Sequence, residues 1–71
     1  MAESFEKQYP NITDFVADGV VEIGYDYNTE TFIRAIDEGG TVWEGKRRYK
    51  SLDDALEDLE RGLKNWFDEI S

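Results

Sequence analysis

The chain has 71 residues, with 17 acidic and 8 basic side chains, a net charge of −9, and neither histidine nor cysteine. Its length suits a single domain, residues 1–71, and its acidity disfavours nucleic-acid binding, which relies on lysine and arginine at the phosphates. The missing histidine and cysteine exclude serine–histidine and cysteine–histidine catalysis and the usual zinc sites. No segment approaches the roughly 20 apolar residues of a membrane span. The first ten residues also lack the apolar region of a signal peptide, so we expect a cytoplasmic protein.

The first predicted element is a short helix near the N-terminus. Residues 1–9 are polar with scattered aromatics and are expected to form a loose tail. Pro10 and Asn11 indicate a helix start, with Asn11 as the N-cap, and Gly19 indicates its end. The apolar face consists of Ile12, Phe15 and Val16. Because two helical turns are unstable alone in water, this helix must dock on the rest of the domain.

Three segments with a period of two follow. They are rich in β-branched and aromatic residues and are predicted to be strands: VVEIGYD at 20–26, TFIRAID at 31–37 and TVWEG at 41–45. The turns between them are predicted at 26–30 and at Glu38-Gly39-Gly40, where the glycine pair suits a hairpin loop. Together the strands predict an antiparallel meander.

Centring the first hairpin on Asn28 sets the predicted register of the meander, and pairs of opposite charge support it. Glu22 faces Arg34 and Arg34 faces Glu44, and such opposite charges across a sheet are favourable. The second pair requires a three-residue loop, since a two-residue loop would turn Trp43 to the other face. One sheet face then carries Val21, Ile23, Tyr25, Ile33, Ala35 and Trp43. The other face carries the charged row together with Val20, Phe32, Ile36 and Val42.

A long C-terminal helix is the clearest element. Ser51 is the predicted N-cap, and Asp54 resembles the acidic residue of a capping box. One continuous apolar stripe follows, formed by Leu52, Ala55, Leu56, Leu59, Leu63, Trp66, Phe67 and Ile70. Gly62 lies at the margin of the stripe and indicates close approach of the protein's own sheet edge, its N-terminal segment or a second subunit.

These elements predict an α+β fold with the order αβββα. The C-terminal helix is expected on the apolar sheet face, and the N-terminal helix at the sheet edge or over the second face. If the N-terminal helix does not cover Phe32, Ile36 and Val42, we expect a homodimer to cover them, because exposed apolar patches mark contact surfaces.

The basic segment KRRYK is the first candidate site. A tyrosine among four cations has the composition of a nucleic-acid loop, but lysine and arginine also end edge strands. The segment is therefore interpreted first as the approach to the helix, with contact to a protein partner and contact to nucleic acid as alternatives. The candidate partner-binding residues are Lys46, Arg47, Arg48, Tyr49, Lys50, Phe32, Ile36 and Val42.

A second candidate is the oxygen-rich turn of Asp26, Asn28 and Glu30. Their alternation resembles the opening of a calcium loop, which would require glycine at its sixth position and glutamate at its twelfth. Those positions hold Thr31 and Asp37, and both flanks read as strands. We therefore expect a plain hairpin turn, with no metal and no cofactor.

The hairpin followed by G-T-V-W-E-G, S-L-D-D-A-L and a helix ending in tryptophan resembles the N-terminal module of HicB-type antitoxins. The likeness covers about residues 20–67 and implies a βββα module that binds a small basic protein. The chain departs from the pattern by the KRRYK insertion, by its N-terminal helix and by lacking the DNA-binding domain that usually follows. It also looks like short uncharacterised bacterial proteins with a Y-P-x-[IL]-T start and an E-I-G-Y-D strand, a likeness that implies no function.

No enzyme is expected, because no catalytic constellation is recognisable. The sequence favours a non-enzymatic protein–protein interaction module that uses a small basic partner or self-association through the second sheet face. The alternatives are a small-ligand or divalent-metal binding protein at residues 26–30, and a nucleic-acid binder at residues 46–50.

Overall fold

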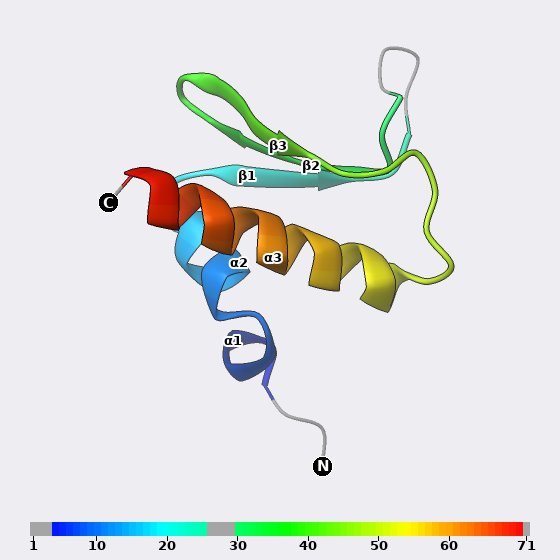
Figure 1. Cartoon of the computed structure of the whole chain (residues 1–71), viewed down its shortest axis with the longest axis horizontal. Coiled ribbons are helices and arrows are strands. Elements are labelled where there is room, and N and C mark those ends of the chain that lie inside the picture. Colours follow the sequence, from blue (N-terminus) through cyan, green and yellow to red (C-terminus); the bar gives the residue numbers. More distant parts are fainter. Residues whose placement is uncertain (1–3, 26–29, 71) are drawn as a thin grey trace.

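The computed structural model describes residues 4–25 and 30–70. It shows an α+β fold in which a three-stranded antiparallel sheet, of order β1-β2-β3, carries the helices on one side (Figure 1). In chain order the elements are α1 (Phe5–Gln8), α2 (Pro10–Phe15), β1 (Val20–Ile23), β2 (Ile33–Asp37), β3 (Gly40–Glu44) and α3 (Leu52–Ile70). The predicted order is confirmed, and α1 is an additional short helix. Within the two described ranges, no helix is both long and apolar enough to cross a membrane.

The first hairpin has the predicted register. Glu22 pairs with Arg34, and Ile23 pairs with Ile33. Arg34 is only 7% exposed. Its Nη2 donates to the carbonyl of Gly24 at 2.8 Å, and its Nε lies 3.7 Å from Oε1 of Glu22. The arginine of the predicted charged row therefore fixes the chain where it leaves β1.

The second hairpin corrects the predicted loop. Asp37 pairs with Gly40, so the loop has two residues instead of three. Gly40 has a φ of +120°, which glycine adopts without a steric penalty. A β-bulge opposite Ala35 and Ile36 adds one residue to β3. Because the bulge compensates for the shorter loop, Trp43 still pairs with Ala35.

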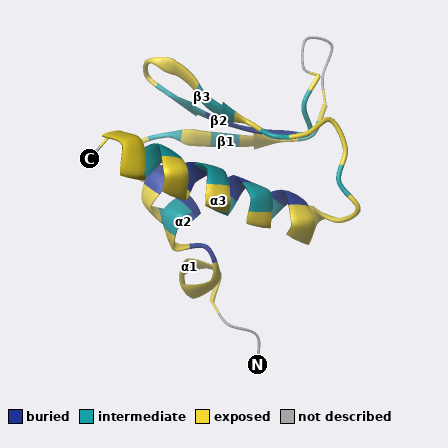
Figure 2. Cartoon of the chain, viewed as in Figure 1, coloured by how far each residue is buried: buried dark blue, intermediate teal, exposed yellow. Residues whose placement is uncertain are grey.

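Helix α3 begins as its sequence predicts. The Ser51 hydroxyl accepts a hydrogen bond from the amide of Asp54 at 3.1 Å, which confirms Ser51 as the N-cap. The helix packs against β2 and β3, and Ala55, Leu59 and Leu63 are fully buried. The predicted stripe is exposed at its two ends, Leu52 and Ile70. Figure 2 shows both ends of α3 as exposed, with buried residues recurring between them on the side that faces the sheet.

The position of α2 corrects a second prediction. Instead of lying at the sheet edge or over the second face, α2 packs against α3 on the same side of the sheet (Figure 1). Ile12 and Phe15 are thereby buried in the common core. The aromatic residues near the end of α3 widen its apolar stripe, so the groove beside α3 offers α2 more apolar contact than a sheet edge would. Phe32, Ile36 and Val42 are therefore not covered by α2.

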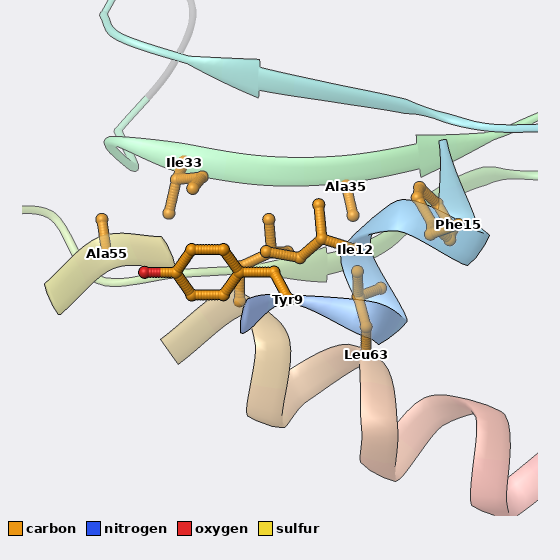
Figure 3. Packing of buried hydrophobic residues seen from close by; sticks show 8 residues of the cluster. Tyr9, Ile12, Phe15, Ile33, Ala35, Ala55 and Leu63 are labelled. Atoms are coloured by element: carbon orange, nitrogen blue, oxygen red, sulfur yellow. The ribbon is translucent and has the colours of Figure 1, made fainter. Parts of the chain in front are cut away.

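Tyr9 belongs to the core rather than to a loose tail. It is 4% exposed, and Figure 3 shows Tyr9 and Ile12 between α3 and the strand that carries Ile33 and Ala35. The expectation of a loose tail is therefore wrong for Tyr9. The preceding residues form α1, where the Ser4 hydroxyl accepts a hydrogen bond at the helix start. Residues 1–3 lie outside the described ranges.

A carboxylate from α3 caps α2. Tyr9 occupies the N-cap position of α2 and provides no side-chain hydrogen bond, and Asn11, predicted as the N-cap, lies inside the helix. Both oxygens of Glu60 accept from the amide of Asn11, at 3.1 and 3.0 Å. Oε1 also accepts from the amide of Ile12 at 3.0 Å, and Oε2 from Nδ2 of Asn11 at 2.6 Å. This bidentate cap satisfies amides that the helix start would otherwise leave unpaired.

Candidate functional site

A hollow of about 600 Å³ lies where the sheet leads into α3. We call it the aromatic–basic hollow; it is lined by Tyr25, Phe32, Arg47, Arg48, Tyr49, Ser51 and Leu52. Four of the predicted contact residues meet in it: Phe32, Arg47, Arg48 and Tyr49. The structure therefore joins the start of β2 to the basic segment, although the two are separated in the sequence.

Phe32 is the fixed wall of the aromatic–basic hollow. Its amide donates to the carbonyl of Lys46 at 3.0 Å, and its carbonyl accepts from the amide of Gly24 at 2.7 Å. The backbone of Phe32 is thus held between the ends of β1 and β3. Its ring lies 5.5 Å from that of Tyr25 and 6.2 Å from that of Tyr49, measured between centroids. These distances are typical of favourable aromatic contacts.

Tyr49 fastens the basic segment to α3. Its hydroxyl accepts from the amide of Lys46 at 2.7 Å and donates to Oδ2 of Asp58 at 2.6 Å. Asp58 also accepts from Nη2 of Arg61 at 3.1 Å. The segment that looked like a plain connection is therefore closed by a side chain of its own, which gives the hollow a defined shape.

The pKa values of two tyrosines predict an alkaline loss of stability. Burial, followed by the hydrogen bond to Asp58, raises the pKa of Tyr49 above its ordinary 10.0. Burial, followed by the charge of Asp53, raises the pKa of Tyr9 above the same value. Their contribution is complete below pH 10, where both are protonated in the folded and unfolded chain. It is lost as the pH rises above 10, because the unfolded chain releases these protons first.

Urea denaturation followed by circular dichroism between pH 7 and 11 measures this dependence. We expect the free energy of unfolding to fall above about pH 10 in the native chain. The fall should be shallower in a variant carrying Tyr9→Phe and Tyr49→Phe. An equally steep fall in that variant would assign the alkaline loss to other groups.

Tyr25 and Leu52 were not predicted to line a site. Tyr25 was expected on the apolar sheet face, but Gly24 has a φ of +118° and turns the chain away from the strand. Tyr25 is therefore 56% exposed, and its hydroxyl donates to the carbonyl of Arg47. Ile23, expected on the same face, is also exposed. The glycine within E-I-G-Y-D is the signal from which this departure could have been inferred.

A second hollow, of about 430 Å³, lies on the other side of Tyr49. It is lined by Lys46, Arg48, Tyr49, Lys50, Asp54, Glu57, Asp58 and Arg61. Three of the four cations of the basic segment thus face three carboxylates of α3. This mixture of charges is unfavourable for a phosphate backbone, which requires a surface of one sign.

The remaining candidates lie apart from these hollows or outside the described residues. Ile36 and Val42 are half-buried in the sheet and line neither hollow. Asp26 and Asn28 of the candidate cation turn lie outside the described ranges, and Glu30 is exposed. Among residues 4–25 and 30–70, no three carboxylates are placed to hold a metal ion.

Comparisons with known proteins do not identify the chain. No protein-family model, no curated protein and no solved structure matches it. The resemblances to HicB-type antitoxins and to short bacterial proteins therefore stay predictions. Function has to be argued from the chemistry of the surface rather than from the fold, because one fold serves many functions.

Proposed function

We propose that the protein is a non-enzymatic protein–protein interaction module and that the aromatic–basic hollow is its contact surface. The observation that carries this proposal is a group of three aromatic rings beside Arg47 and Arg48 in a chain of net charge −9. Tyrosine and arginine are enriched among residues that dominate binding energy. The hydrogen bonds of Tyr25 and Tyr49 fix the rings before binding, which lowers the entropic cost of association.

The hollow favours a peptide segment with an apolar or aromatic side chain next to an acidic one. The rings supply an apolar surface, and the two exposed arginines supply donors for a carboxylate. Nucleic acid is the alternative occupant, but the carboxylates beyond Tyr49 would repel its backbone. A small ligand or a divalent metal at residues 26–30 is a further alternative, which rests on the sequence alone.

Removing the two arginines tests the proposal. The tagged protein is used to isolate a partner from a lysate of its source cells, and the purified partner is then titrated against variants. We expect a variant with Arg47→Ser and Arg48→Ser to bind at least tenfold more weakly, which corresponds to about 1.4 kcal/mol. Isothermal calorimetry measures the affinity, and circular dichroism verifies that the variant is folded.

A variant with Lys7→Ser and Lys64→Ser is the matched control. It loses the same two charges at exposed positions outside the hollow, so its affinity should remain within twofold of the native value. Equal weakening of both variants would indicate general electrostatic attraction. Capture of RNA in place of a protein, with loss on nuclease treatment, would favour the nucleic-acid alternative.

Self-association over the second sheet face is the second candidate function. It is favoured by the observation that α2 lies on the opposite side, while Val20 is 57% exposed. Of the residues predicted for a homodimer, Phe32 and Val42 pack against the core cluster, so a homodimer over this face would rest mainly on Ile36 and Val20. Light scattering of the purified protein distinguishes a dimer from a monomer that awaits another partner.

A further inference from the structure

A small pocket of about 160 Å³ lies at the opposite end of the molecule from the basic segment. We call it the acid-rimmed pocket; it is lined by Asp14, Phe15, Asp18, Gly19, Asp37, Glu38, Trp66 and Phe67. The end of α2, the β2–β3 turn and the last turns of α3 meet there. Figure 1 shows this end near the C-terminus, whereas the segment leading into α3 lies at the far end of that helix.

Three aromatic rings form the wall of the acid-rimmed pocket. The rings of Phe15 and Trp66 meet edge to face, with centroids 5.7 Å apart and planes at 80°. The rings of Trp66 and Phe67 lie 5.2 Å apart. Gly19 keeps the chain close to this wall, since a Cβ there would lie 2.6 Å from Cε2 of Phe15. The wall is therefore closely packed.

Four carboxylates and, among the residues that the structure describes, no cation line the same pocket. Asp14, Asp18 and Glu38 are exposed, and Asp37 is half-buried. Oδ1 of Asp37 accepts from the amide of Gly39 at 2.8 Å, which leaves Oδ2 for a ligand. Carboxylates alone would be an ordinary solvated surface, but here they surround a cavity whose wall is aromatic. Negative charge at the edge of aromatic rings favours a cation that also has apolar surface.

The size of the pocket and the spacing of its carboxylates limit the kind of ligand that it can bind. Pockets for small-molecule ligands usually measure about 300–1,000 Å³, so this one accommodates a single side chain. The described residues place no three carboxylates together for a metal ion, whereas a flat guanidinium can stack on a ring and reach carboxylates at its edge. The aliphatic part of the same side chain would lie against the apolar wall.

We propose that the acid-rimmed pocket binds an arginine side chain of a basic protein partner. This inference goes beyond the aromatic–basic hollow and does not depend on it, because the two surfaces share no residue. The net charge of −9 favours contact with a basic partner. The inference places that contact at the acid-rimmed pocket. The arginine stacks against the aromatic wall and forms charge-assisted hydrogen bonds with the rim.

A capped peptide with two arginines separated by glycine is the probe. Titration is followed by ¹H–¹⁵N NMR of the full chain, and we expect the largest shifts at the Trp66 indole and the Gly19 amide. The same peptide with citrulline in place of arginine keeps the shape and loses the charge, so it should produce no saturable shift. Saturable shifts at other residues, or equal binding of the citrulline peptide, would overturn the proposal.

Isosteric neutral variants complete the test. Asp37→Asn with Glu38→Gln keeps the turn geometry, and we expect the dissociation constant for the arginine peptide to rise at least fivefold. The control, Glu30→Gln with Glu57→Gln, changes the net charge equally at exposed positions outside the pocket, and should stay within twofold. An equal loss in both would show attraction by net charge alone and overturn the site. The variant with Arg47→Ser and Arg48→Ser should bind this peptide with the native affinity. The proposal for the aromatic–basic hollow and the proposal for the acid-rimmed pocket can therefore be refuted separately.

Discussion

Replacing Glu60 with alanine is expected to lower the free energy of unfolding by about 2–3 kcal/mol, since hydrogen bonds to a charged group contribute about 1.5–3 kcal/mol. This is a large share of the roughly 3–5 kcal/mol that one core of this size supplies. The carboxylate accepts four hydrogen bonds from Asn11 and Ile12. Without it, the start of α2 has no side-chain cap, and α2 loses its polar attachment to α3. Urea denaturation followed by circular dichroism measures the change.

Glu57→Ala is the matched control for Glu60→Ala. Glu57 is exposed on the same helix, three residues earlier, so its removal should change stability by less than about 0.5 kcal/mol. Glu60→Gln should be intermediate, because an amide has one acceptor oxygen where the carboxylate has two. Amide hydrogen exchange should accelerate first at Asn11 and Ile12. If Glu57→Ala and Glu60→Ala cost the same, the cap does not hold α2 in place.

The sheet and α3 could be predicted because their signals are local and repeated. The alternation of apolar and polar residues identified the strands. Centring the first turn on Asn28 predicted the pairing of Glu22 with Arg34 that the structure shows. The 3.6-residue stripe identified α3 and the face that it buries. The second hairpin was harder, because Gly39 and Gly40 both tolerate turn conformations. The loop is one residue shorter than predicted, and the bulge adds one residue to β3. Trp43 therefore pairs with Ala35 as predicted, although the loop differs.

The position of α2 could not be predicted, because it depends on contacts between distant residues. A six-residue helix with Ile12 and Phe15 would suit any apolar groove. Glu60 and Lys64 are also spaced for an ion pair one turn apart along α3, a common arrangement. In the structure, the carboxylate of Glu60 instead accepts hydrogen bonds from the amides of α2. Because Glu60 and α2 are far apart in the sequence, no local pattern predicts this contact.

The two surfaces differ in how far the sequence revealed them. The basic segment and Phe32 were recognised, because four cations around Tyr49 stand out in an acidic chain. The acid-rimmed pocket was missed, because its residues come from α2, the β2–β3 turn and α3. Only the packing of Phe15 against Trp66 brings them together. Acidic residues are also so frequent in this chain that no pair of them is informative by itself.

The end of α3 carries acidic residues, which is the reverse of what the helix dipole favours. A helix C-terminus carries partial negative charge and is stabilised by nearby cations. The last turn of α3 has no basic residue, contains Asp68 and Glu69, and adjoins the four carboxylates of the acid-rimmed pocket. An acid in this position interacts unfavourably with the helix dipole, typically by about 0.3–1 kcal/mol. A cationic partner would relieve this repulsion, so binding at this end should also stabilise the fold.

Replacing Gly62 with alanine is expected to lower the free energy of unfolding by about 1–3 kcal/mol, the usual cost of overpacking a core. The same change at an open helix position gains about 1 kcal/mol from helix propensity. Here the added methyl group would lie 2.6 Å from Cδ1 of Trp43. The close approach expected from a glycine within α3 is therefore made by the protein's own sheet. Thermal unfolding should show a decrease of about 4 °C or more in the midpoint.

The second half of this test is the same substitution in a chain that carries Trp43→Leu. Leucine leaves space above Gly62, so the Gly62→Ala change should now stabilise the helix by up to about 1 kcal/mol. A reversal of sign between the two backgrounds would attribute the cost to the indole ring, because helix propensity is the same in both. If Gly62→Ala destabilises both chains equally, Trp43 is not the reason for the glycine.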